Sequence, residues 1–471
     1  MLFNDLLYIF FFLPFATVFA NLLKKLNINL SKVLVILLSL LFYAFLKIEY
    51  LPLIIFSLIF NYFIVSFFHN NLHKKFLLFI CISVNIFILG YFKYKNFLIE
   101  NINFIFDTNF ILAELSFPLS LSFLTFQQIS FAVDSYNSKK KIKFIDYFLC
   151  VLFFPHFIAG PILKYDIFVK ELKTNFCKIN YNYLSLGIIL ISVGIFKKSF
   201  LADNLSIFVN RNYINISNLN FFETWLTNYA WAFQFYFDFS GYVDIALGSA
   251  LLLSIKLPIN FNSPYKATNV IDFWQRWHIT LGKFFNTYIY YPLIRYIGDV
   301  TLLKSSLVIF FIFLLSGIWH GPNYTFIIFG ILNGIAVVFN YFYKNYIKIK
   351  LNNFCSIFFT FNYITFTLMF FRSSNLNESI IMMRNMLNFS NFLNELEIFF
   401  EKIYYIKFEK SEVFFGILLI ISFITIFFLK NSNEIKLTQK NLNSKVISYI
   451  ILGVIGVLSI KNKLTFIYFE F

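Results

Sequence analysis

The chain has 471 residues, of which 59% are hydrophobic and only 13% are charged. A soluble globular domain is about half apolar and about one quarter charged, so this composition excludes that class. Lysine and arginine outnumber aspartate and glutamate by 39 to 23, and in so apolar a chain we attribute the excess to loops that face the anionic lipids of a bilayer, with no nucleic acid as a partner.

Apolar runs of about twenty residues recur along the sequence and predict membrane-spanning helices. We expect an all-α, polytopic membrane protein with about 11–13 membrane segments, some of them re-entrant or interfacial. No internal repeat or soluble domain stands out, so residues 1–471 are predicted to form one integral-membrane domain. The candidate segments cover residues 6–22, 33–46, 51–68, 76–92, 115–133, 147–163, 183–201, 221–255, 303–319, 324–343, 354–371, 413–430 and 446–460.

Lysines are distributed unevenly between the first six of these segments. Nine fall in the first, third and fifth loops, and three fall in the second and fourth. Because basic loops stay in the cytoplasm, this bias places the N-terminus outside it. The nine are Lys24, Lys25, Lys32, Lys74, Lys75, Lys139, Lys140, Lys141 and Lys143, and the three are Lys47, Lys93 and Lys95.

Two stretches interrupt the apolar pattern with proline. In FFPHFIAGPILK (153–164) the run is broken, and we expect His156 there to be an interfacial histidine without a chemical role. The stretch IKLPINFNSPYKATNVIDFWQRWH (255–278) contains two prolines and several asparagines, which argues against a membrane span. We predict a loop and a re-entrant or interfacial segment that carries His278 into the protein.

Polar side chains also occur inside apolar runs. Gln234, Asp238 and Asp244 lie in FQFYFDFSGYVDIALG (233–248), and the first two are four residues apart, on one helical face. An unpaired carboxylate in lipid costs several kcal/mol, about 3 on insertion scales. We therefore expect these side chains to form a polar interior in which the carboxylates are paired.

Two histidines, His278 and His320, each directly follow a tryptophan, Trp277 or Trp319. His320 closes a run without charge, and an ionisable ring at such a place usually faces a cavity or the protein interior. A neutral imidazole is the side chain best suited to remove a hydroxyl proton near pH 7. The four cysteines have no metal-ligand spacing, so no metal is expected.

The string FWQRWH followed by SGIWHG resembles the membrane-bound O-acyltransferase family, and most closely its alginate O-acetyltransferase branch. The likeness covers most of residues 90–375. Its segments, in order, are GYFKYKNF (90–97), PLSLSFLTFQQISFAVDSY (118–136), FFPHFIAGPILK (153–164), GIFKKSFLAD (194–203), FQFYFDFSGYVDIALG (233–248), NFNSPYKATNVIDFWQRWHITL (260–281), SGIWHGPNYTFIIFGILNG (316–334) and FFRSSN (370–375). Residues 286–296, NTYIYYPLIRY, depart from the YIPLGG motif of the branch.

The resemblance implies the reaction and its setting. His320 matches the catalytic histidine of the family and His278 the supporting one. Members of the branch move acetyl groups to an envelope or extracellular glycan, such as peptidoglycan or an alginate-like polysaccharide. The implied donor is a cytosolic acetyl thioester such as acetyl-CoA, with no bound cofactor, and a periplasmic esterase-like protein is the implied partner. The implied location is the bacterial cytoplasmic (inner) membrane.

The chemistry also needs donors for the oxyanion of the attacked thioester. His278, the backbone amides near Gly321 and the side chains of Trp277, Trp319 and Asn323 are all candidates, and the sequence does not choose among them. For substrate binding we select Trp274, Arg276, Trp277, Trp319 and Asn323.

Two other functions remain open from the sequence. D-Alanyl transfer to teichoic acid is the reaction of a close relative within the family. A membrane transporter of acyl groups would also place Asp238, Asp244 and His320 inside the bilayer. Many transporter folds contain an internal duplication, however, and none is detectable here.

The lysine bias makes the topology testable. A cysteine introduced at Ser138 is expected to be protected from a membrane-impermeant thiol reagent in intact spheroplasts and to react after permeabilisation, because its loop is predicted to face the cytoplasm. The parent chain, with its four native cysteines, reports background labelling. Labelling in intact spheroplasts would reverse the predicted orientation.

Overall fold

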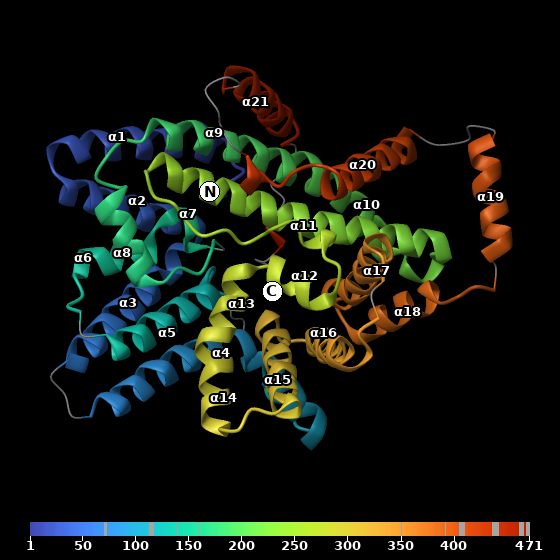
Figure 1. Ribbon diagram of the computed structural model, residues 1–471, viewed down its shortest axis with the longest axis horizontal. Helices are drawn as coiled ribbons and strands as arrows, with labels where there is room; N and C mark the ends of the chain where they lie inside the picture. The colour runs from blue at the N-terminus through green and yellow to red at the C-terminus, as the bar shows by residue number, and fades with distance from the viewer. Residues whose placement is uncertain are drawn as a thin grey trace.

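The computed structural model describes residues 1–69, 73–112, 117–138, 140–158, 160–349, 351–390, 392–404, 410–435, 442–460 and 466–467. Lys139, one of the lysines behind the topology prediction, lies outside these residues. The described chain is helical and contains no strand, which confirms the all-α prediction (Figure 1). Helices are expected because a helix satisfies its own backbone groups where lipid cannot.

Helices of the first third form one side of the molecule, coloured blue to teal in Figure 1. They are α1 (Leu13–Leu26), α2 (Ile28–Lys47), α3 (Leu51–Ser66), α4 (Lys74–Phe106), α5 (Leu121–Asn137), α6 (Phe144–Leu152) and α7 (Phe154–Phe157). The middle contains α8 (Tyr165–Thr174), α9 (Tyr181–Ile195), α10 (Asp203–Ile214), α11 (Phe221–Leu252), α12 (Val270–Arg276), α13 (Ile279–Phe285) and α14 (Tyr291–Ile297).

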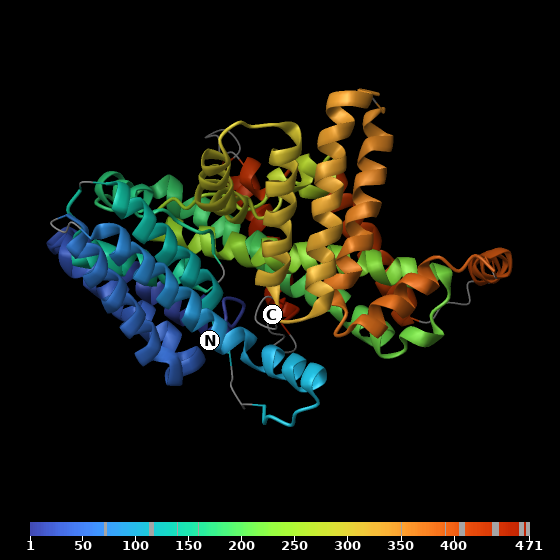
Figure 2. The ribbon, with the colours of Figure 1, turned by 90° about the horizontal axis from the view of Figure 1, so that it is seen from below.

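In the last third, α15 (Leu302–His320), α16 (Tyr324–Phe342) and α17 (Asn353–Arg372) rise from the layer that contains α11 (Figure 2). They are followed by α18 (Leu376–Met386), α19 (Phe392–Tyr404), α20 (Lys410–Phe427) and α21 (Leu442–Leu458). Short turns of π- or 3-10 helix are η1 (Tyr8–Phe12), η2 (Ile48–Tyr50), η3 (Phe67–His69), η4 (Phe196–Ala202), η5 (Ile216–Asn218), η6 (Pro264–Lys266), η7 (Asn286–Tyr290), η8 (Tyr343–Ile347) and η9 (Ser432–Glu434).

Eight helical stretches in the described part of the chain are long and apolar enough to cross a membrane. The expected number was about 11–13, and the difference has structural causes. α5 has only 17 residues, and the run predicted over 147–163 breaks into α6 and α7. α11 is long enough, but it contains glutamate, aspartate and glutamine. α2 and α3 follow each other in one apolar stretch, Ile28–Ser66, in which the backbone leaves the helical conformation only at Lys47, with φ of −154° and ψ of 78°.

His156 is not interfacial, so that prediction was wrong. Its side chain lies at the break between α6 and α7 and is only 3% exposed. The N–H of Phe154 bonds to the Ser39 hydroxyl instead of continuing α6. This leaves the carbonyl oxygen of Cys150 available, and Nε2 of His156 donates to it at 2.8 Å. The imidazole therefore stabilises a helix break.

Two of the lysines counted as loop residues are buried inside helices. α4 continues past the predicted end at residue 92 to Phe106, and Lys93 within it is 8% exposed. Lys24 lies in the last turn of α1 and is 7% exposed. The topology prediction therefore depends on the remaining lysines.

α11 is the central element, and every residue from Ala230 to Leu251 is buried. It runs antiparallel to α9 at very short range (Figure 1). A Cβ at Gly194 would lie 2.6 Å from the carbonyl oxygen of Gly241, and one at Gly248 would lie 2.6 Å from that of Gly187. Only glycine allows this approach, which brings the backbone after α9 against the carboxylates of α11.

Both aspartates of α11 are paired with lysines of η4. Lys197 Nζ lies 2.7 Å from Asp244 Oδ2, and the two side chains are 8% and 4% exposed. Lys198 bonds to Asp238 and, at 2.8 Å, to Asp203 Oδ1. The cost of an isolated buried charge explains why each carboxylate has a cation beside it.

Removing one member of the Lys197–Asp244 pair is expected to destabilise the protein. Asp244→Asn should cost about 3–5 kcal/mol because it leaves the Lys197 ammonium buried without a counter-charge. The double variant Lys197→Met with Asp244→Leu should recover most of the loss, and Asp238→Asn should cost less than Asp244→Asn because Lys198 keeps Asp203 as a counter-charge. The measurements are the unfolding temperature in detergent and the activity per folded molecule.

The matched control is Asp166→Asn, whose partner Lys140 and own side chain are 73% and 59% exposed. That change should cost at most about 1 kcal/mol. If Asp244→Asn unfolds at the wild-type temperature but has lost activity, the carboxylate takes part in the reaction and the structural interpretation is wrong.

Candidate active site

His278 stands between α12 and α13, at the end of the loop that follows α11. Its backbone is left-handed, with φ of 44° and ψ of 54°, an unusual conformation that is often found at functional sites. The buried Asn260 holds this turn: its side-chain oxygen accepts from the Thr280 N–H at 3.1 Å and hydroxyl at 2.7 Å, and its carbonyl accepts from the Ile279 N–H at 2.9 Å. Burial lowers the pKa of His278 to about 3, so its ring is neutral at pH 7.

His320 is the last residue of α15. The chain becomes extended at Gly321, which ends the helix and turns toward α16. α15 and α16 are in close contact, since a Cβ at Gly317 would lie 2.4 Å from the carbonyl oxygen of Phe326. The His320 ring lies edge-on to Trp319 and Phe371, at centroid distances of 4.9 and 5.0 Å. The sequence prediction that this ring lies in the protein interior is confirmed by its 6% exposure.

A small pocket extends from His320. Its wall is almost entirely aromatic or aliphatic, and the His320 ring and the Trp274 and Trp277 indoles are the only lining side chains with polar atoms. The lining comes from five helices and from Trp277, directly after α12, and is made of Phe235, Phe273, Trp274, Trp277, His320, Phe329, Ile364, Leu368 and Phe371.

The second histidine lies beside this pocket and is not part of its lining. The His278 ring lies 5.0 Å from that of Phe239 and 6.0 Å from that of Phe123. Phe123 also lies 5.7 Å from Trp319, so one phenyl ring separates the two Trp–His motifs.

The other predicted site residues fall into two groups. Trp274 and Trp277 line the pocket, and the buried indole N–H groups of Trp274 and Trp319 have no hydrogen-bond partner in the described chain. Asn323 and Arg276 have structural contacts instead. The Asn323 side-chain oxygen caps α16 by accepting from the Thr325 N–H at 3.1 Å, and Arg276 Nε pairs with Asp272 Oδ1 at 2.7 Å.

The predicted polar interior lies on α11. Gln234 is 7% exposed, and its side-chain oxygen has no partner within the described ranges. Asp238 accepts from the Ile467 N–H at 3.0 Å as well as from Lys198. These residues lie outside the pocket lining and support the elements that form it.

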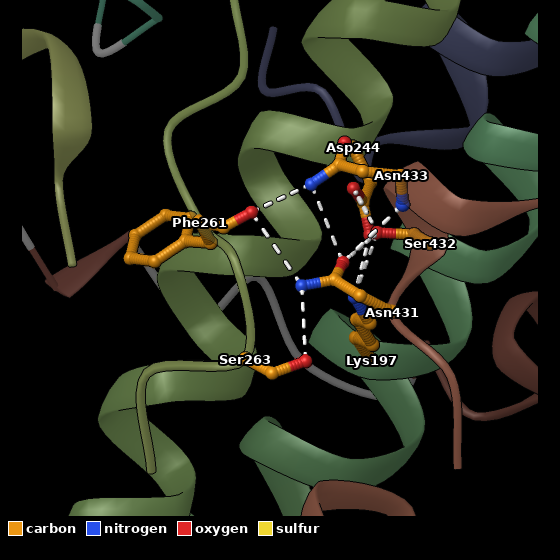
Figure 3. A network of polar contacts seen from close by, with 7 residues as sticks. All are labelled: Lys197, Asp244, Phe261, Ser263, Asn431, Ser432 and Asn433. Atoms are coloured by element: carbon orange, nitrogen blue, oxygen red, sulfur yellow. Dashed lines mark hydrogen bonds and ion pairs between the residues drawn. The ribbon is translucent and has the colours of Figure 1, made fainter. Parts of the chain in front are cut away.

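The Lys197–Asp244 pair is connected to the loop of His278 (Figure 3). Ser432 in η9 donates to Asp244 Oδ1 at 2.8 Å. The neighbouring Asn433 Nδ2 donates to the carbonyl oxygen of Phe261 at 2.6 Å, and Asn431 reaches the same oxygen and the Ser263 hydroxyl at 3.5 Å each. A turn from the C-terminal part of the chain therefore anchors the loop that carries His278.

Several contributing residues were not selected from the sequence. Lys197 and Lys198 lie in GIFKKSFLAD, where adjacent lysines in an apolar run could have been matched to the two carboxylates of α11. Asn260 gave no signal, since asparagines are common in this chain. Lys93, from GYFKYKNF, bonds to the backbone of His320 and was counted as a loop lysine. Among the described residues, no group of three or more His, Cys, Asp or Glu side chains could hold a metal ion.

Known proteins share long stretches of this sequence. Residues 137–381 match the model of the MBOAT, membrane-bound O-acyltransferase, family. A peptidoglycan O-acetyltransferase of Helicobacter pylori is 37% identical over 421 residues, 82% of this chain and 80% of that protein. A probable alginate O-acetylase of Pseudomonas aeruginosa is 32% identical, with 71% and 65% covered. A teichoic acid D-alanyltransferase of Bacillus subtilis is 28% identical, with 48% and 60% covered.

The family match spans more than half of the sequence and includes both Trp–His motifs. It contains α11, the loop after it and the helices that line the pocket. The chain belongs to the membrane-bound O-acyltransferase family.

Proposed function

We propose that this protein transfers an acetyl group from a cytosolic thioester, such as acetyl-CoA, to hydroxyl groups of a cell-envelope glycan. Relatives named as a peptidoglycan O-acetyltransferase and a probable alginate O-acetylase support the acetyl group and the glycan. The first of these aligns over more of both chains at higher identity, which favours peptidoglycan as the acceptor.

The observation that carries the proposal is the small aromatic pocket that ends at His320. A buried neutral imidazole beside a pocket for a short apolar group is the arrangement that acetyl transfer to a hydroxyl needs. Such a donor is made in the cytosol and the glycan lies outside, so the protein belongs in the bacterial cytoplasmic membrane. A periplasmic esterase-like protein is the expected partner, and no cofactor is required besides the thioester substrate.

The reaction uses His320 as general base. Its imidazole takes the proton of the attacking hydroxyl while the hydroxyl oxygen bonds to the thioester carbonyl carbon. The tetrahedral intermediate then loses its carbon–sulfur bond, and the imidazolium returns the proton to the leaving thiolate. The products are the acetyl ester and the free thiol, and the histidine is regenerated.

The developing oxyanion needs hydrogen-bond donors that are already in place. The Trp274 N–H is the best candidate, because it is buried, has no partner in the described structure and belongs to a residue of the pocket wall. Trp319, with an equally unengaged N–H, is directly before His320. Asn323 is a weaker candidate because it caps α16.

D-Alanyl transfer is the second candidate function. The teichoic acid D-alanyltransferase of Bacillus subtilis covers only 48% of this chain at lower identity, which makes this candidate weaker. Analysis of the ester on purified envelope polymers separates the two, because one reaction leaves acetyl and the other leaves D-alanine.

We expect the two histidines to be unequal. His320→Ala should fold and bind the thioester but transfer no detectable acetyl, because general-base catalysis contributes about 10²–10⁴-fold. His278→Ala should retain a small activity with a raised KM for the donor, because its ring lies beside the pocket. The measurements are glycan acetyl content in cells and donor titration on the purified protein.

The matched control is His73→Ala, an exposed histidine at the start of α4. It should behave as wild type. Normal acetylation by His320→Ala at equal expression would contradict the mechanism in which His320 is the general base.

Loss of the Trp274 indole N–H should slow the chemical step. Trp274→Phe keeps an aromatic ring in the wall, and removal of one oxyanion donor typically costs about 10²–10³-fold in kcat. Trp225→Phe is the control, because its N–H bonds to the carbonyl oxygen of Met386 at 3.2 Å and its ring does not line the pocket. Wild-type kcat in Trp274→Phe would exclude this donor.

A further inference from the structure

α15 ends inside the protein, and the end of a helix leaves backbone groups to be satisfied. The last four carbonyls of any α-helix have no partner within it, and its C-terminus carries a partial negative charge. In α15 these carbonyls belong to Gly317, Ile318, Trp319 and His320, because the chain is extended from Gly321. The backbone of the proposed general base therefore lies where a helix is least constrained by its own hydrogen bonds.

Side chains of α4 satisfy three of these carbonyls. Lys93 Nζ donates to the carbonyl oxygens of Trp319 at 2.6 Å and His320 at 2.9 Å. The neighbouring Tyr94 hydroxyl donates to that of Ile318 at 2.6 Å. The Lys93 ammonium also lies 5.7 Å from the ring centroids of both Trp319 and Phe117. A lysine that is 8% exposed thus caps α15 from another helix.

We propose that Lys93 is a positioning residue for His320. Lys93 holds the last turn of α15 so that the imidazole of His320 stays at the end of the pocket. The positive charge of Lys93 also attracts the partial negative charge at the C-terminal end of the helix. A displacement of about 1 Å at a reacting group costs about 10²-fold in rate, so a loose last turn would slow proton transfer. This inference rests on the proposed function, because it assigns Lys93 to the same proton transfer.

A second buried lysine, Lys24, also caps the end of a helix, but it lies away from the pocket. Lys24 is 7% exposed, and its Nζ donates to the carbonyl oxygen of Leu253 at the end of α11, at 2.8 Å, and to Asn21 Oδ1 at 2.9 Å. It lies 4.1 Å from the centroid of the Phe176 ring. None of these residues lines the pocket. Lys24 therefore serves as the control for Lys93, because it is a buried lysine that caps a helix end away from the proposed general base.

The experiment compares Lys93→Met with Lys24→Met. Both remove a buried cap and should lower the unfolding temperature in detergent. Only Lys93→Met should reduce kcat per folded molecule, by about 10- to 100-fold, with the KM for acetyl-CoA within about twofold of wild type. Lys93→Arg keeps the charge and several hydrogen-bond donors, so its kcat should be about tenfold higher than that of Lys93→Met. Lys24→Met should keep the wild-type kcat.

The outcomes separate the inference from the proposed function. If Lys93→Met and Lys24→Met have the same kcat as wild type, Lys93 is only a structural cap and the inference is overturned. If Lys93→Met does not fold, Lys93→Gln and Lys93→Arg decide: equal, wild-type kcat in both contradicts a positioning role, and a higher kcat in the arginine variant supports it. If cells with wild type and cells with His320→Ala have the same glycan acetyl content at equal expression, the proposed function fails instead.

Discussion

The structure depends on the rule that polar and charged groups inside an apolar protein must find their partners within it. α9 and α11 approach so closely that only glycines fit at their crossing points, and this approach brings Lys197 and Lys198 to Asp244 and Asp238. Attraction between the charges offsets the cost of removing them from water only when the geometry is good, so the contact specifies one arrangement of the two helices. Ser432 and its neighbouring asparagines extend the contact to the loop of His278.

The same rule explains why the site is built at helix ends. A continuous helix offers no free backbone groups and only one face, whereas a helix that ends in the interior exposes carbonyls and changes the chain direction. α15 ends at His320 and α12 ends just before Trp277, and both ends lie near the pocket. Helix ends need partners from elsewhere in the chain: Lys93 donates to the carbonyls that end α15, and Asn260 accepts from the N–H groups that begin α13.

Much of the fold could be predicted from the sequence because lipid-facing helices need long apolar runs. α15, predicted over 303–319, covers Leu302–His320, and α17, predicted over 354–371, covers Asn353–Arg372. The two Trp–His motifs were also identifiable, since an ionisable ring at the end of such a run is costly. The partners could not be predicted, because composition does not show which lysine lies in a loop. Lys93 and Lys24 are buried caps, Asn323 caps α16, Arg276 pairs with Asp272 within α12, and His156 completes a helix break.

α11 shows why hydropathy alone does not identify the central element. Its polar residues make it too polar to count as a membrane span, yet every residue from Ala230 to Leu251 is buried, and both of its aspartates are paired with lysines of η4. Asn228 Nδ2 donates to the carbonyl oxygen of Thr365 and Trp231 Nε1 to that of Leu368, each at 2.9 Å, and these bonds fix α17 against α11. Leu368 lines the pocket, as does Phe235 one turn further along α11. A helix whose polar groups bond to other helices cannot be surrounded by lipid. The polar residues of α11 therefore indicate a central position, where the helix supports a pocket assembled from several helices.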